Sequence, residues 1–286
     1  RHTLDRYRPL QDQDVPDADV IIATWWETAE WIAPLSAAKG VKVYFVQHHE
    51  VFDYLPQERV EATYRLPFFH ITIAQWLVDL LRDRYQSPAI ALVPNGVDLD
   101  QFNCPVRNKA SIPTIGFVYS ATPWKGSDIA LQAYESARQS IPNLRLITFG
   151  TEAPKATLAL PPNAQHQVQP PQSDLKTLYS QCDAWLFSSR VEGFGLPILE
   201  AMACRTPVIA TPVGAAPELL ASGGGILLNA VDPREMAIAI QKLCQLGPHQ
   251  WQDLSSQAYE IASKHTWSGA TDLFEAALYQ ALDRTD

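Results

Sequence analysis

Short apolar runs rich in β-branched residues alternate along the chain with segments in which apolar residues recur at helical spacing. The first two runs, 19–24 and 41–46, flank a segment over 27–39 that can form a helix ended by Gly40. Runs of this kind are typical of strands in a parallel sheet that is covered on both faces. The pattern therefore predicts a strand–helix–strand unit in this part of the chain.

A polar, irregular segment divides the alternation into two series. Residues 98–113 contain two prolines and show no apolar period, which is typical of a linker between domains. Before this linker, 71–85 has the spacing of an amphipathic helix, and the strand expected at 90–93 is followed by the turn signal Pro94-Asn95-Gly96.

After the linker the alternation resumes. The strands are expected over 114–119, 144–149, 183–187, 207–210 and 225–228, with a short one around Gln167 and Val168. The helices are expected over 127–140 (with Ser127 as candidate N-cap), 173–181, 197–204, 217–221, 232–246, 251–264 and 267–282.

Two such series predict an α/β fold of two doubly wound, Rossmann-like domains. We expect an amino-terminal domain over 1–104, a carboxy-terminal domain over 105–266, and a final helix over 267–286 that packs back on the first domain. Ligands of such sheets bind outside the carboxyl ends of the strands, so the cleft between the domains is the expected place for a site.

Composition and charge exclude several classes of protein. Of the 286 residues 47% are apolar and 19% charged, a globular balance, and the net charge of 22 − 31 = −9 argues against a general nucleic-acid binder. No apolar run approaches the roughly 20 residues of a membrane-spanning helix, so at most peripheral membrane contact is expected. The four cysteines lack metal-binding spacing and are predicted to be buried thiols of a cytoplasmic protein, with disulfides or a zinc site as the alternatives.

One loop between a strand and a helix carries two carboxylates eight positions apart. Glu192 follows the strand at 183–187, and Glu200 lies in the next helix. Gly193 and Gly195 allow close approach of the backbone, and the free N–H groups at the helix start suit a phosphate. Glu200 can accept hydrogen bonds from a ribose diol, as acidic residues do in dinucleotide folds. The alternatives are that Glu192 is an ordinary carboxylate near a helix N-terminus and that Glu200 is an exposed helix residue.

This loop resembles the E-x7-E signature of family 4 retaining glycosyltransferases, which have the GT-B fold. Four further segments of this sequence resemble motifs of the same family and occur in the same order. Residues 93–102 resemble V-P-N-G-V-D…F, and residues 117–128 resemble F-x-G-R…K-G-x-D. Residues 207–218 resemble P-V-I-A…G…P-E, and Thr266 and Trp267 resemble the closing (F/Y)-(S/T)-W. The resemblance covers about residues 19–282.

The resemblance implies an enzyme that moves a sugar from a nucleotide-diphosphate sugar to an acceptor hydroxyl with retention of anomeric configuration. It implies no metal and no cofactor besides the donor, because basic groups and helix amides neutralise the diphosphate. The acceptor would be a sugar, a lipid-linked molecule or a small molecule. We expect a same-face substitution in which the leaving phosphate takes the acceptor proton.

The resemblance also assigns roles at the donor site. Lys125 matches the diphosphate lysine, while Ser120 occupies the position of the family's partner arginine. Glu192 matches the catalytic glutamate that contacts the donor sugar, and Glu200 matches the ribose-binding glutamate. The remaining candidates are the loop residues Gly193, Phe194 and Gly195 for the diphosphate, Arg190 as a further cation, and Gly214 near the base or diphosphate.

The segment Gln47-His48-His49-Glu50 follows the strand at 41–46. The family often has a histidine here that contacts the sugar or the acceptor, and we assign His48 to this catalytic position, with His49 as the alternative register. His49 and Glu50 are further cleft candidates. An exposed or structurally satisfied histidine is the simpler alternative, and a metal cluster is disfavoured because adjacent side chains of a strand point to opposite sides.

The amino-terminal part departs from the family pattern, since the family's first domain normally begins with additional strand–helix units. The chain enters at the third or fourth strand, so a truncated or processed form is expected. The alternative function is a non-catalytic sugar-nucleotide-binding or scaffold protein. A phosphorylase or epimerase on the same architecture is less favoured, and the missing G-x-G-x-x-G motif disfavours an NAD-dependent oxidoreductase.

Overall fold

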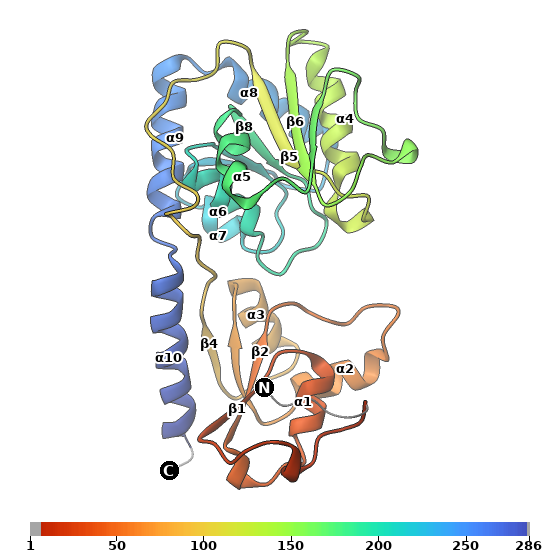
Figure 1. Ribbon diagram of the computed structural model, residues 1–286, viewed down its shortest axis with the longest axis vertical. Helices are drawn as coiled ribbons and strands as arrows, with labels where there is room; N and C mark the ends of the chain where they lie inside the picture. Colours follow the sequence, from red (N-terminus) through yellow and green to blue (C-terminus); the bar gives the residue numbers. More distant parts are fainter. Residues whose placement is uncertain (1–6, 285–286) are drawn as a thin grey trace. The chain divides into compact units, whose positions relative to one another are not determined.

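The computed structural model describes residues 7–284, which form two compact units (Figure 1). Unit 1 comprises 7–94 and 268–284, and unit 2 comprises Asn95–Trp267. The boundary thus follows Pro94, whereas the sequence placed it after residue 104. The reason lies in the contacts of 95–104 with unit 2: the ring of Phe102 packs edge-on against Tyr179, and Cys104 Sγ lies 3.7 Å from the carbonyl oxygen of Lys176.

Unit 1 contains a four-stranded parallel sheet in the order β1-β2-β3-β4. The strands are β1 (Val20–Ala23), β2 (Val41–Val46), β3 (Phe69–Thr72) and β4 (Ile90–Leu92). Its helices are α1 (Trp26–Ile32), α2 (Gln57–Tyr64), α3 (Gln75–Asp83) and α10 (Trp267–Asp283), with short 3-10 turns at Asp12–Asp14 and Ala37–Lys39.

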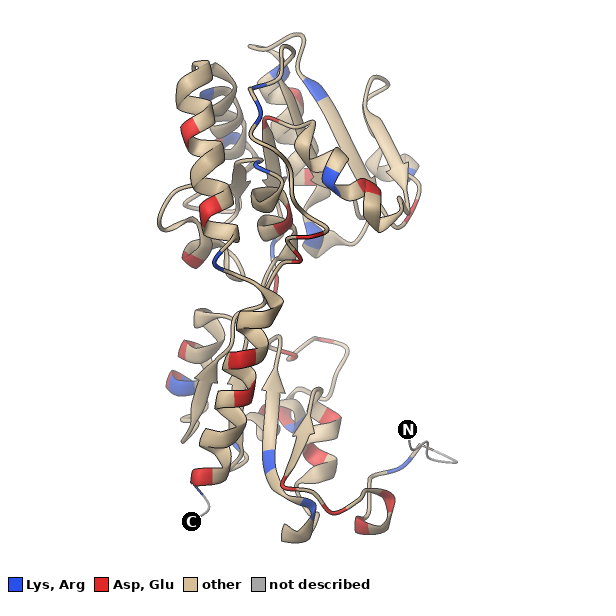
Figure 2. Ribbon diagram, turned by 60° about the vertical axis from the view of Figure 1, so that its left-hand side comes forward, with Lys and Arg blue, Asp and Glu red and all other residues tan. Residues whose placement is uncertain are grey.

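The helix α10 packs on this sheet through both small and large apolar residues. Ala277 and Ala281 are buried in one cluster with Val43 and Ile71, and the ring of Phe274 packs edge-on against Phe45 of β2. The charged positions of α10, Asp272, Glu275 and Asp283, are all acidic (Figure 2). The helix therefore adds to the hydrophobic core of unit 1 and to the negative charge of the chain.

Unit 2 contains a six-stranded parallel sheet in the order β10-β9-β8-β5-β6-β7. The strands are β5 (Thr114–Val118), β6 (Arg145–Gly150), β7 (Gln165–Val168), β8 (Ala184–Phe187), β9 (Val208–Ala210) and β10 (Gly225–Leu227). The helices are α4 (Ser127–Arg138), α5 (Gln172–Ser180), α6 (Leu196–Ala203), α7 (Ala216–Leu220), α8 (Pro233–Gln245) and α9 (Pro248–Ala262), with 3-10 turns η3 (Pro123–Lys125) and η4 (Ala156–Leu158).

The sheet of unit 2 is doubly wound. The chain proceeds outward from β5 to β6 and β7, then returns to β8 on the other side of β5 and continues to β9 and β10. The winding direction therefore reverses between β5 and β8. Such a reversal opens a crevice outside the carboxyl ends of the strands.

Close packing between β5 and β8 requires a residue without a side chain at one position. A Cβ atom on Gly116 would lie 2.3 Å from the ring of Trp185, which is fully buried. The indole fills this space and stacks on Phe149 with 5.5 Å between ring centroids. Both rings also contact Tyr179, so this aromatic cluster packs α5 against the sheet.

The structure corrects several sequence expectations. The segment 71–85 is not one helix, because Phe69–Thr72 forms the fully buried strand β3 before α3 begins at Gln75. The helix α2 was not predicted, and the helix expected over 27–39 ends at Ile32, just before Pro34. The N-cap of α4 is Gly126 and not Ser127.

All four cysteines are buried and free, as expected. Within the described chain no helix has both the length and the apolar character needed to cross a membrane.

Candidate functional site

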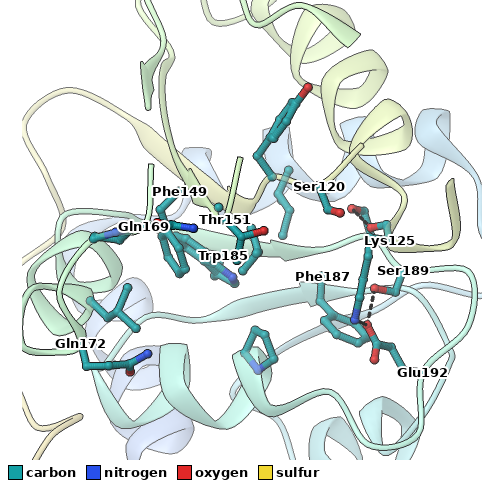
Figure 3. Close-up of a pocket in the computed structure, with 18 residues that line it drawn as sticks. Ser120, Lys125, Phe149, Thr151, Gln169, Gln172, Trp185, Phe187, Ser189 and Glu192 are labelled. Atoms are coloured by element: carbon teal, nitrogen blue, oxygen red, sulfur yellow. Dashed lines mark hydrogen bonds and ion pairs between the residues drawn. The ribbon is translucent and has the colours of Figure 1, made fainter. Parts of the chain in front are cut away.

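A cavity of about 440 Å³ lies in unit 2 at the carboxyl ends of β5, β6, β7 and β8 (Figure 3). Apolar walls are formed mainly by Phe149, Leu175, Trp185, Phe187 and Pro197. Polar side chains come from Ser120, Thr151, Gln169, Gln172 and Ser189, and the charged ones from Lys125 and Glu192. The cavity thus occupies the crevice where the winding reverses.

Lys125 and Glu192 face each other in this cavity (Figure 3). The ammonium Nζ of Lys125 lies 2.7 Å from Oε1 of Glu192, and the Ser189 hydroxyl donates to the same oxygen at 2.8 Å. The lysine side chain is 43% exposed and the glutamate side chain 15% exposed. Within the described chain these two are the charged residues that line the cavity, so the charges of its lining cancel.

Ser120 also lines the cavity, at the end of β5. Its hydroxyl accepts a hydrogen bond from the backbone N–H of Thr122 at 3.2 Å, and its own N–H donates to Oγ of Ser127 at 2.9 Å. These bonds fix the turn that leads to Lys125.

Arg190 is not among the residues that line the cavity. Its guanidinium binds both carboxylate oxygens of Asp128, at 2.8 and 2.6 Å, and donates to the carbonyl of Pro123. Its backbone N–H donates to the carbonyl of Trp124 at 2.7 Å. Arg190 therefore connects the Glu192 loop to the Lys125 turn, and its role as a further cation for the phosphates stays a prediction.

Gly126 allows the Lys125 turn to lie directly against the Glu192 loop. Its φ is +68°, and a Cβ atom there would lie 1.8 Å from the carbonyl oxygen of Ser188. A residue with a side chain would thus have to separate the two segments that carry Lys125 and Glu192.

The residues between Glu192 and α6 are buried and do not line the cavity. Gly195 is the N-cap of α6, and Phe194 is 4% exposed. The carbonyl of Phe194 accepts a hydrogen bond from the N–H of Ala215, and Gly214 lies against it. Gly193, Phe194, Gly195 and Gly214 therefore support the loop from behind, with no side chain of their own in the cavity.

Glu200 lies in α6, outside the lining of the cavity. Its Oε2 accepts a hydrogen bond of 2.6 Å from the hydroxyl of Tyr179 on α5. Burial raises the pKa of Glu200, and the Tyr179 hydrogen bond opposes that rise.

The histidine segment lies in unit 1, after β2. His48 is half-buried, with its ring near Phe52 and Trp76 and its Nδ1 2.9 Å from the carbonyl oxygen of His49. His49 Nε2 lies 2.7 Å from the hydroxyl of Tyr85. Burial, with the nearby positive charge of Arg84, lowers the pKa of His49 to about 4.

Glu50 is only 3% exposed, so it is not an open cleft residue as expected from the sequence. Its Oε2 accepts hydrogen bonds from the N–H of Trp26 at 2.9 Å and from the hydroxyl of Tyr44 at 3.2 Å. Because Trp26 begins α1, the carboxylate satisfies the start of that helix. Burial raises the pKa of Glu50 to about 7.

Among residues 7–284, no group of three His, Cys, Asp or Glu side chains is placed to hold a metal ion.

Sequence reasoning missed several lining residues. Thr151 and Gln169 follow β6 and β7, as Ser189 follows β8. The rule that ligands meet the carboxyl ends of parallel strands could have indicated them. Tyr179 could not have been found in this way, because its contact with Glu200 depends on how α5 packs against α6.

The fold and the cavity define a protein of the doubly wound α/β class with a ligand-sized cavity at a switch point. Residues 106–264 match the family model described as glycosyl transferases group 1, and the chain belongs to this family.

A D-inositol 3-phosphate glycosyltransferase of Stackebrandtia nassauensis is 29% identical over 243 residues, which cover 74% of this chain and 53% of the relative. The chain thus spans about half the length of this curated relative.

Solved structures share the fold. Sucrose-phosphate synthase of Thermosynechococcus elongatus superposes with a TM-score of 0.75 at 20% identity over 94% of this chain and 74% of that one. Anabaena HepE in complex with UDP and glucose superposes with a TM-score of 0.72 at 21% identity over 90% and 77% of the two chains. The GT-B fold predicted from the sequence, with two Rossmann-like parallel-sheet units, is confirmed.

Proposed function

We propose that this chain is a retaining glycosyltransferase that binds a nucleotide-diphosphate sugar in the cavity of unit 2 and transfers the sugar to an acceptor hydroxyl. The observation that carries the proposal is the convergence of Lys125, Ser189 and Glu192 at the switch point between β5 and β8. Membership of the glycosyl transferases group 1 family supports it.

Lys125 and Ser120 bind the diphosphate in this proposal. The ammonium is the one cation that the described lining offers, and the anionic diphosphate competes with Glu192 for it. Ser189 still donates to Glu192 when Lys125 turns to the phosphates, because its hydroxyl comes from the same loop. Glu192 thereby stays in place to contact the donor sugar and to stabilise charge near the anomeric carbon.

The base and the ribose take the rest of the site. Phe149 and Trp185 offer an apolar wall, and the amides of Gln169 and Gln172 can both donate and accept hydrogen bonds. Glu200 binds the ribose diol. Anabaena HepE is known in complex with UDP, which makes UDP the first nucleotide to test.

On the acceptor side we propose His48 as the contact to the sugar or the acceptor. The acceptor is a sugar, a lipid-linked molecule or a small molecule. Retention follows from a same-face substitution in which the leaving phosphate takes the proton of the acceptor hydroxyl. We also propose that the protein acts in the cytoplasm. The diphosphate needs no metal in this scheme, because Lys125 and the amide groups at the start of α6 carry the positive field.

The test is turnover of a panel of nucleotide sugars by the full chain, followed as release of the nucleoside diphosphate, with and without EDTA. We expect release with at least one donor, insensitivity to EDTA, and a loss of at least about 100-fold in Glu192→Gln. Glu135→Gln, on the surface of α4, is the matched control and should leave release unchanged.

Proton NMR of the sugar first released from an α-linked donor tests retention. The α-anomer is expected first, and initial release of the β-anomer would contradict the retaining route. Nucleotide binding without any release would instead favour a non-catalytic sugar-nucleotide-binding protein.

A further inference from the structure

Tyr179 lies on α5 and is fully buried, and its hydroxyl is hydrogen-bonded to the carboxylate of Glu200 on α6. It donates to Oε2 of Glu200 at 2.6 Å. The ring is held by aromatic neighbours, with centroids 4.4 Å from Trp185 and 5.6 Å from Phe149. Because these contacts hold the ring, packing fixes the position of the phenol oxygen.

This pair lies beside the cavity. Phe149 and Trp185, which contact the ring of Tyr179, both line the cavity. Leu175 lines it from the preceding turn of α5, and Pro197 lines it from the turn of α6 that precedes Glu200. The hydrogen bond thus connects the walls of the cavity that α5 and α6 provide.

The bond also acts on the charge of Glu200. Burial favours the neutral acid and raises its pKa, whereas the Tyr179 hydroxyl favours the carboxylate. The other ionisable group that senses Glu200 is the Cys204 thiol at the end of α6. Among the described residues, burial and the Tyr179 hydrogen bond are the two influences on the pKa of Glu200.

We propose that Tyr179 is a positioning residue for Glu200. The phenol of Tyr179 holds the Glu200 carboxylate in place as the hydrogen-bond acceptor for the ribose of a nucleotide. The proposal rests on the ribose-binding role of Glu200 in the proposed function. A ribose diol needs an acceptor that is ionised and held in one direction, and the hydrogen bond from Tyr179 favours the ionised carboxylate and fixes the position of its Oε2.

The test compares Tyr179→Phe with the wild type, because this change removes the hydroxyl and keeps the ring. Tyr134→Phe is the matched control: Tyr134 is equally buried in unit 2, and its hydroxyl donates to a backbone carbonyl, that of Leu144. Glu200→Gln removes the charge itself.

The first readout is the ratio of the dissociation constants of 2′-deoxy-UDP and UDP, measured by calorimetry on the full chain. The wild type should bind UDP about tenfold more tightly, since one charge-assisted hydrogen bond to the ribose is lost in the deoxy analogue. The ratio should approach one in Tyr179→Phe and in Glu200→Gln, and should stay at the wild-type value in Tyr134→Phe.

The second readout is the pKa of the Glu200 carboxyl in the ligand-free protein, followed by carbon NMR and assigned with Glu200→Gln. It should be higher in Tyr179→Phe than in the wild type and unchanged in Tyr134→Phe. A Tyr179→Phe protein with an unaltered ratio and an unaltered pKa would overturn the proposal, as would equal changes in Tyr134→Phe. If the wild type binds no nucleotide, the proposed function fails, while the NMR titration still decides whether Tyr179 controls Glu200.

Discussion

Lys125 and Glu192 neutralise each other at the cavity of unit 2, so in the proposed function a diphosphate has to compete with Glu192 for the ammonium group. The pair is partly exposed, so the contact itself contributes little to stability. An incoming diphosphate can therefore displace Glu192 from the ammonium at small cost. The hydrogen bond from the Ser189 hydroxyl, which belongs to the same loop, would still hold Glu192 in place after that displacement.

Some residues of the candidate site could be predicted from the sequence, and others could not. Lys125, Ser120 and Glu192 were selected as parts of one site, and the structure brings them to one cavity. Arg190 and Glu50 were selected on position along the chain alone. Whether such a residue faces a cavity or pairs elsewhere depends on tertiary contacts, here with the partly exposed Asp128 for Arg190 and with the start of α1 for Glu50.

Glu50 leads to a prediction on the pH dependence of stability. Its pKa is about 7 in the folded protein and near 4.5 when exposed, so the folded state holds the proton more tightly. Stability from this group is therefore complete below about pH 4.5 and is lost as the pH rises through 7. Its contribution should fall by up to about 3 kcal/mol over that range.

The measurement is urea unfolding of the wild type and Glu50→Gln between pH 4 and 8. His49 and His70 also have lowered pKa values, but they are present in both proteins and cancel in the difference. The stability of the wild type relative to Glu50→Gln should decline with rising pH. A difference that stays flat would show that Glu50 is not held as a buried acid.

At the scale of elements, two short segments act together to hold the charged pair. The turn at η3 carries Lys125, the loop after β8 carries Glu192, and Arg190 with Asp128 connects them. Because the connection lies outside the cavity, it can be broken without touching a ligand group.

Arg190→Gln should therefore weaken UDP binding by about three- to tenfold, through loss of the fixed spacing between the two segments. The melting temperature should fall by only a few degrees, because the ion pair is about 40% exposed on both sides. Arg138→Gln, which breaks an exposed ion pair on α4, is the control and should change neither quantity by much. Unchanged UDP affinity in Arg190→Gln would show that the connection does not position the site.

The pattern of elements in unit 2 could be predicted almost completely from the sequence. Most of its strands are short apolar runs between turn signals, and most of its helices have apolar residues at helical spacing, so local sequence and tertiary environment agree. The strand β3 was misassigned in unit 1 because Phe69–Thr72 is buried at all four positions. A run buried on both faces has no period that distinguishes it from a buried helix.

At the scale of the whole molecule, the two units differ in what they contain. Every residue that lines the cavity lies between Val118 and Pro197, inside unit 2. Unit 2 also has its own core, which spans β5, β6, β8, α4 and α8. Nucleotide binding should therefore be a property of unit 2 alone, whereas transfer to an acceptor should need more of the chain.

We accordingly expect a fragment of residues 95–267 to fold and to bind UDP within about threefold of the affinity of the full chain. Circular dichroism and calorimetry on the fragment check this. A folded fragment that binds no UDP, beside a full chain that does, would place essential contacts outside unit 2.

Whether the cavity of unit 2 binds a nucleotide diphosphate is tested by measuring the affinity of the full chain for UDP and for uridine, in the wild type and in Lys125→Met. We expect the wild type to bind UDP at least about tenfold more tightly than uridine, because Lys125 contacts the diphosphate. This preference should be largely lost in Lys125→Met, while uridine binding is retained. Equal affinity for UDP and uridine in the wild type, or a preference that survives in Lys125→Met, would contradict the assignment of this cavity to a nucleotide diphosphate.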